Sequence, residues 1–130
     1  MDAAQALAEL TELSSQIESA VVLRADGAVL GSSLADSGAA EALARSALEL
    51  VAAAFELSSP PQEVTRVEVE LPEGALFVLR EGAQTIAATI GPQPTAGLVA
   101  YDLRTCLQGI DAQEKTKKPR AARKPKAVDE

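Results

Sequence analysis

Apolar residues recur at helical spacing in three stretches of the chain. The first stretch predicts an amphipathic helix of about four turns, because its large apolar residues fall on one stripe: Leu7, Leu10, Leu13 and Ile17. Asp2 stands at the start of this stretch with Gln5 three positions further on, which is the spacing of a capping box. We expect this helix to run directly into a strand at Ala20.

The second helical stretch covers residues 36–57, with Asp36 as its predicted N-cap and Pro60-Pro61 preventing its continuation. Its apolar surface is broader than one face of a sheet requires, which indicates a second neighbour. The third stretch begins after Thr95, and Gly109 is its predicted terminator. Its apolar stripe consists of Val99, Leu103, Cys106 and Ile110.

Between the first two helices, short apolar runs at residues 20–25 and 28–32 flank Asp26-Gly27. This dipeptide predicts a tight two-residue hairpin turn with positive φ at both central positions. Such a turn places Leu23 opposite Leu30, so we expect one face of the hairpin to carry Val21, Leu23, Ala28 and Leu30.

Three further strands are predicted at residues 64–71, 75–80 and 84–90, separated by short turns at Gly74 and Gly82. The first of them alternates apolar and polar residues, as a strand with one solvated face does, whereas the other two are apolar on both sides. Because about 110 residues sustain one core, hairpin and meander should share one five-stranded sheet. The more polar strands at 28–32 and 64–71 suit its edges, and the fold class is α+β.

Charge divides the chain into two parts. Residues 1–110 carry five arginines and fifteen acids (5 − 15 = −10), and residues 111–130 carry seven cations and four acids (7 − 4 = +3). We therefore predict one domain over 1–110 and a basic, disordered tail over 111–130. No run is long enough to span a bilayer and no signal peptide is evident, so a cytoplasmic location is expected.

The sequence offers little catalytic chemistry. It has no histidine and few aromatic residues, which removes the commonest general base and metal ligand. The loops at residues 31–33 and 91–97 lack a phosphate-binding pattern and are interpreted as a turn and a cap. Cys106 is interpreted as a buried reduced thiol, and Glu68 and Glu70 as a solvated face. We expect no enzyme, no catalytic residues, no cofactor, no metal and no small-molecule substrate.

An uncovered strand edge is the strongest functional signal. The strand at 64–71 has no later strand to pair with, and the second helix has surplus apolar surface beside it. Pairing around a two-fold axis would satisfy both features in a homodimer; the alternative is a monomer whose charges protect the edge. The predicted interface residues are Leu43, Ala47, Leu48, Val51, Phe55, Val64, Arg66, Val67, Glu68 and Val69.

Three local patterns in this order resemble the roadblock/dynein light chain family, most closely its bacterial members. They are VVLRADGAVLGSS, GALFVLREGAQTIAATI and GLVAYDLR. The resemblance implies a five-stranded antiparallel sheet in the order 2-1-5-4-3, with the second helix on one face and the first and third helices on the other. It also implies dimerisation through the third strand and second helix. Pro60-Pro61 and the basic tail depart from the family pattern.

By this resemblance the protein is expected to bind and regulate, or scaffold, a small Ras-like GTPase in bacterial signalling, polarity or motility, without catalysis. A small-molecule sensor with a PAS-like or profilin-like sheet is one alternative. Another is a structural protein that uses its tail to bind nucleic acid or an anionic membrane; the simpler interpretation is a solvated tail or one folded back on the acidic body. The tail cations are Lys115, Lys117, Lys118, Arg120, Arg123, Lys124 and Lys126.

Overall fold

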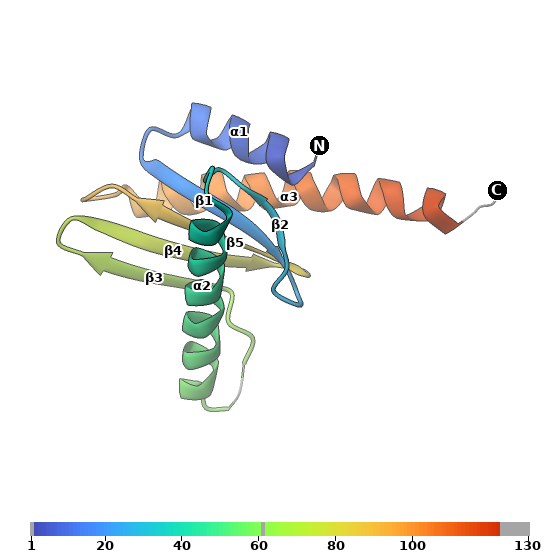
Figure 1. Cartoon of the computed structure of the whole chain (residues 1–130). Coiled ribbons are helices and arrows are strands. Elements are labelled where there is room, and N and C mark those ends of the chain that lie inside the picture. The colour runs from blue at the N-terminus through green and yellow to red at the C-terminus, as the bar shows by residue number, and fades with distance from the viewer. Residues whose placement is uncertain (1, 61, 123–130) are drawn as a thin grey trace.

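The computed structural model describes residues 2–60 and 62–122, with side chains described as far as Ile110. Three helices and five strands follow one another in the predicted order (Figure 1). They are α1 (Ala3–Leu13), β1 (Ile17–Arg24), β2 (Val29–Ser32), α2 (Ser37–Leu57), β3 (Arg66–Leu71), β4 (Gly74–Glu81), β5 (Gln84–Ile90) and α3 (Ala96–Ala122).

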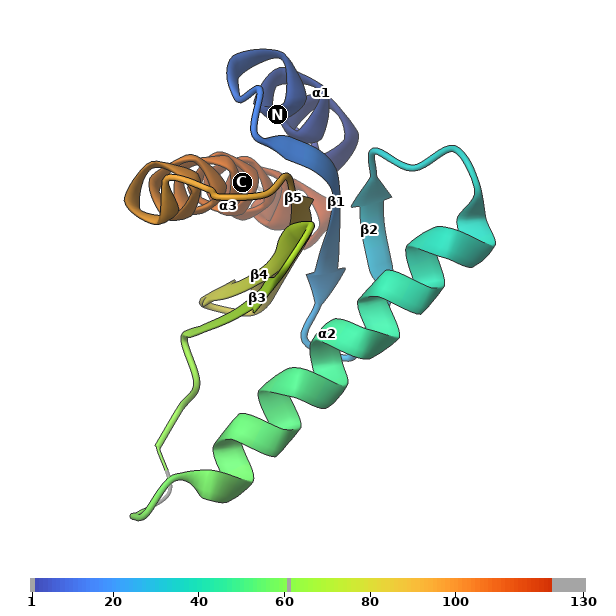
Figure 2. The ribbon, with the colours of Figure 1, turned by 90° about the vertical axis from the view of Figure 1, so that its left-hand side faces the viewer.

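The strands form one antiparallel sheet in the order β2-β1-β5-β4-β3. Helix α2 covers one face of this sheet, and α1 and α3 cover the other (Figure 2). The α+β fold class and the strand order are therefore confirmed, with β2 and β3 at the edges. The two-sided apolar strands β1, β4 and β5 lie in the middle, where both of their faces are covered.

Each face of the sheet has its own apolar core. Phe77, Leu79 and Ile86 point toward α1 and α3, whereas Val21 and Val78 point toward α2. This division follows from the period of a strand, because successive side chains leave the backbone on opposite faces.

Helix α1 is shorter than its stripe predicts. The Asp2 cap is confirmed, since its Oδ1 accepts a hydrogen bond from the backbone N–H of Gln5 at 2.9 Å. The helix ends at Leu13, whose side chain is 83% exposed, and Ile17 is instead the buried first residue of β1. Two features explain the difference. Serine favours helix ends over helix interiors, and Ser14 is the residue at which α1 ends. The strand that follows is stabilised by the pairing of Ile17 with Ile90.

The hairpin loop also differs from the prediction. Gly27 alone among the loop residues has a positive φ, of 92°, and the N–H of Gly27 and the C=O of Ala28 both bond Arg24. This is the pattern of a three-residue loop with a bulge, so Leu23 pairs with Val29 and not with Leu30. Leu30 consequently packs on the α1 and α3 face, opposite to the face predicted for it.

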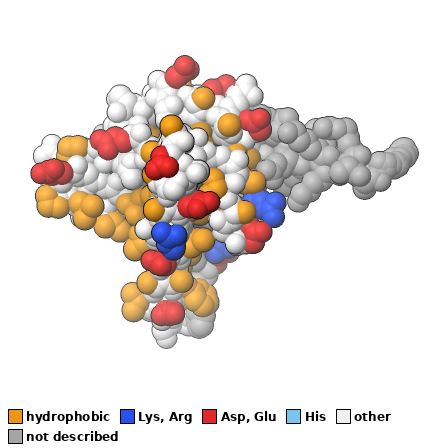
Figure 3. Space-filling model, in the orientation of Figure 1, with side chains coloured by type: hydrophobic (Ala, Val, Ile, Leu, Met, Phe, Trp, Pro, Cys, Tyr) orange, Lys and Arg blue, Asp and Glu red, His pale blue; other side chains and the backbone are white. Residues whose placement is uncertain are grey.

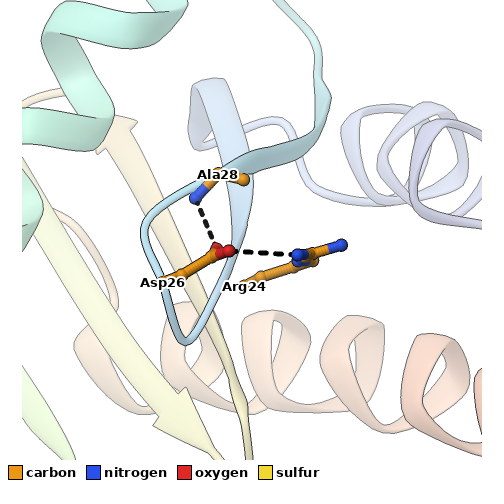
Figure 4. Close-up of polar contacts among 3 residues, drawn as sticks. All are labelled: Arg24, Asp26 and Ala28. Atoms are coloured by element: carbon orange, nitrogen blue, oxygen red, sulfur yellow. Dashed lines mark hydrogen bonds and ion pairs between the residues drawn. The ribbon is translucent and has the colours of Figure 1, made fainter.

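The Asp26 carboxylate accounts for this loop (Figure 4). One oxygen accepts the backbone N–H of Ala28 at 3.0 Å, and the other pairs with Nη2 of Arg24, also at 3.0 Å. These contacts hold Asp26 in its turn without a positive φ, and they lower its pKa, the bond from Ala28 contributing most.

Helix α3 does not end at Gly109 but continues to Ala122. Gly109 has no positive φ, so it lacks the left-handed conformation by which a glycine terminates a helix. Of the segment predicted to be disordered, residues 111–122 are thus helical, and 123–130 lie outside the described residues. The boundary at residue 110 stays a prediction from composition.

Candidate interaction surface

Helix α2 buries small side chains fully against the sheet, and Leu43 and Val51 pack there in part. Asp36 caps it by accepting the N–H of Gly38 at 3.2 Å. Its buried residues are all alanines, namely Ala40, Ala44 and Ala47. Because alanine fills little space, the helix lies close to the sheet and its larger apolar side chains are left on the flanks.

The C-terminal part of α2 projects beyond the sheet on the β3 side (Figures 1 and 2). Phe55 is 47% exposed there and Leu57 is 86% exposed. Ser58 closes the helix, with its N–H and its hydroxyl both bonding the C=O of Phe55. Figure 3 shows hydrophobic side chains on both sides of this projecting end. Exposed apolar side chains gathered in one place are typical of contact surfaces.

Strand β3 lies beside that projection and pairs only with β4 among the described strands. Val67 faces α2 and packs against the core on that side. On the opposite face, Nε of Arg66 lies 2.8 Å from Oε2 of Glu68 in the same strand. The free edge of β3 therefore has one apolar face and one charged face.

Three open grooves flank α2: one lies against the hairpin loop, and the other two contain residues of β3 or of the segments next to it. One of these two, of about 510 Å³, is lined by Leu48, Val51, Ala52, Phe55, Gln62, Glu63, Val64 and Arg80. The other, of about 660 Å³, includes Leu43, Ser46, Leu71 and Leu76. Both open to solvent along the helix, which suits the side chains of another protein better than an enclosed small ligand.

Solved structures with the same fold include the Roadblock/LC7 domain from Streptomyces avermitilis, with a TM-score of 0.79 and 22% identity over 88% of this chain and 99% of that one. The chain has the roadblock/LC7 fold. MglB from Myxococcus xanthus gives 0.73 and 16%, over 90% and 91% of the two chains. The gliding protein MglB from Thermus thermophilus gives 0.69 and 16%, over 83% and 84%. No family model and no curated protein matches the sequence.

In this fold the predicted interface residues gather around β3 and α2. Leu48, Val51, Phe55 and Val64 share the first groove. Ala47 is the exception, because it lies on the sheet-facing side of α2, is 0% exposed and is not available for contact. The remaining predicted residues lie on the second groove or on β3 itself: Leu43, Arg66, Val67, Glu68 and Val69.

The prediction missed two exposed apolar residues on the same surface, Leu57 and Leu71, of which Leu71 is 56% exposed. Leu71 continues the apolar alternation of Val67 and Val69, so the period of the strand could have identified it. Leu57 is the last residue of α2 and lies after the apolar pattern, so no comparable signal marked it. The tail cations cannot be placed in this way: their side chains lie outside the described residues.

The groups that the sequence offers for catalysis or metal binding can be placed as far as Ile110, where side chains are described. No cluster of metal-ligating side chains occurs there, and none of the described helices is long and apolar enough to cross a membrane. The serines of the first candidate loop bond the backbone: Ser33 Oγ accepts the N–H of Ala20 and Ser32 Oγ that of Leu34. Burial raises the pKa of the Cys106 thiol to about 11, which disfavours the nucleophilic thiolate.

Proposed function

We propose that this roadblock domain works as a homodimer that binds a small Ras-like GTPase and regulates or scaffolds it, without catalysing a reaction of its own. One observation carries the proposal: the edge of β3 that no described strand pairs with lies beside the projecting apolar end of α2. The two features adjoin, so a single partner can cover both.

A second copy of the chain is that partner. An exposed strand edge presents unpaired N–H and C=O groups that another strand can satisfy. In an isologous contact the same patch on each copy would pair β3 with β3 and bring the two α2 helices together. The proposed interface comprises the predicted residues without Ala47, together with Leu57 and Leu71.

The GTPase part of the proposal is supported by the fold. The likeness covers 90% of this chain in the comparison with Myxococcus xanthus MglB, and the resemblance of the sequence to bacterial roadblock proteins implies a Ras-like GTPase as partner. The same resemblance supports a role in bacterial signalling, polarity or motility, and the cytoplasmic location predicted from the sequence belongs to the proposal. The open, apolar grooves beside α2 suit protein partners and disfavour a small-molecule sensor.

Light scattering tests the dimer. The protein should become monomeric in each of three variants, Val67→Asp, Leu48→Asp and Phe55→Asp. Burying an unpaired carboxylate in the interface costs several kcal/mol, which corresponds to a dimer dissociation constant raised about a hundredfold or more. Leu13→Asp is the matched control, since Leu13 is exposed on α1, on the opposite face of the sheet. Circular dichroism establishes that each variant is folded. An unchanged dimer mass in all three β3 and α2 variants would refute the surface.

Binding to a GTPase is tested separately. A Ras-like GTPase encoded in the same genome, loaded with GDP or with a non-hydrolysable GTP analogue, is titrated into the protein by calorimetry. Binding that differs between the two nucleotides, together with an altered hydrolysis rate, would support regulation; equal binding would support scaffolding. A dimer that binds none of the genome's Ras-like GTPases would contradict this part of the proposal.

A further inference from the structure

The backbone of β3 limits how a second copy can pair with it. Arg80 donates its N–H to the C=O of Thr65 at 2.9 Å, and β3 and β4 continue in register from there to Leu71 opposite Gly74. Along a strand of an antiparallel pair, the N–H and C=O of one residue point toward the neighbouring strand, and those of the next residue point away from it. The residues that turn theirs toward the free edge are therefore Arg66, Glu68 and Glu70.

These three residues also carry the charges of β3, and their side chains lie on the face of the sheet opposite to Val67. In a two-fold antiparallel pair, charged residues can meet at hydrogen-bonded positions only as two members of this set. A register with Arg66 opposite Arg66, or Glu70 opposite Glu70, sets like charges against each other. So does a register with Glu68 opposite Glu70.

Two registers remain, distinguished by the residue on the axis. With Glu68 on the axis, Arg66 faces the second copy's Glu70, but the two Glu68 carboxylates face each other. With Val67 on the axis, each Arg66 faces the second copy's Glu68 and no like charges are directly opposed. Because Arg66 already contacts Glu68 of its own strand at 2.8 Å, this pairing completes a square of alternating charges.

We propose that β3 pairs with a second copy in one register, with Val67 on the two-fold axis and each Arg66 opposite the Glu68 of the other copy. This inference rests on the proposed homodimer and specifies its geometry. On the α2 face the two Val67 side chains meet at a position without backbone hydrogen bonds, where side chains approach most closely. The charged square makes the interface selective for an identical chain.

Disulfide trapping tests the register in a Cys106→Ser background, which removes the single native thiol. Val67→Cys should cross-link to itself under mild oxidation, because Cβ atoms of directly opposed residues lie about 4.5–5.5 Å apart and a disulfide spans about 3.5–4.5 Å. Glu68→Cys is the matched control and should not cross-link, since the two copies of residue 68 would be diagonal neighbours about 7–8 Å apart. Cross-linking through residue 68 in place of residue 67, or through neither, would overturn the register.

Charge reversal gives an independent reading by sedimentation equilibrium. Arg66→Glu should weaken the dimer about tenfold or more, because it opposes carboxylates at both corners of the square. Adding Glu68→Arg should restore the affinity, since the square is rebuilt with reversed signs. Adding Glu70→Arg instead should not restore it; rescue by this second change would place Glu68 on the axis and refute the proposal. A reduced, unmodified protein that is monomeric would instead refute the homodimer itself.

Discussion

Substituting Gly31 should disturb the packing of α1 against β2 and destabilise the fold. A Cβ atom added at Gly31 would lie 2.8 Å from Cβ of Ala3 and 3.1 Å from the backbone N of Ala4. Carbon atoms in contact prefer about 3.5–4.0 Å, so in Gly31→Ala the first turn of α1 must move by about 0.7–1.2 Å to restore that separation. The obstacle is backbone and a methyl group that has no other rotamer, so the strain cannot relax locally.

Overpacking of this kind costs about 1–3 kcal/mol of unfolding free energy. With a typical urea dependence, the unfolding midpoint of Gly31→Ala should fall by about 0.5–1.5 M. Adding Ala3→Gly should recover part of the loss, because it removes the closest atom. Gly97→Ala is the control: nothing lies within 4 Å of its added Cβ, so its stability should be unchanged or slightly higher. A wild-type midpoint in Gly31→Ala, or no recovery in the double variant, would refute the reasoning.

Three further outcomes are expected. Gly109→Ala should raise the unfolding free energy by about 1 kcal/mol, because α3 continues through residue 109 and its added Cβ meets nothing within 4 Å; a loss of stability in urea would mean that the helix ends there. Cys106 should react slowly with an alkylating reagent near neutral pH, because burial and then the charge of Glu9 raise its pKa to about 11. The alkylation rate should still be rising above pH 9.0, the ordinary pKa of a thiol. A rate in the native protein that levels off at the same pH as in urea-unfolded protein would contradict this. Asp26→Asn should lower the melting temperature at neutral pH but not in strong acid. Because the pKa of Asp26 is lowered in the folded protein, its carboxylate stabilises the fold above the ordinary value of 3.8, and this contribution disappears as the pH falls through the lowered pKa. An equal effect at neutral pH and in strong acid would argue against the ionised contact.

The order of elements was predictable because each one carries a local signal. Asp2 and Asp36 cap their helices as expected, and the alternation around Val67 marks a strand with one apolar face. Strand order required more than periodicity: two-sided apolar strands had to be central, and the family resemblance supplied the arrangement. That arrangement placed the candidate interaction surface at β3 and α2.

The sequence-based predictions were wrong where two local structural tendencies compete, or where contact with a residue distant in sequence determines the local structure. Ile17 continues the helical stripe in sequence, yet pairing with Ile90 in β5 places it in a strand. The hairpin signal of Asp26-Gly27 does not distinguish a two-residue from a three-residue loop. The hydrogen bond that the N–H of Ala28 donates to the Asp26 carboxylate favours the three-residue loop. Gly109 resembles a terminator by type, but termination depends on its φ, which residue type alone does not determine.

The alanines on the sheet-facing side of α2 relate the fold of one chain to the proposed association of two copies. Ala40, Ala44 and Ala47 recur at helical spacing and bring the helix close to the sheet. Larger residues at these positions would be buried by the sheet and would hold the helix further away, leaving the flanks free to be polar. With alanines there, the bulk of the apolar surface lies beside the contact, at residues such as Leu48 and Phe55, where one sheet cannot cover it. The same composition that packs α2 on the sheet thus leaves the apolar surface that the proposed homodimer would cover.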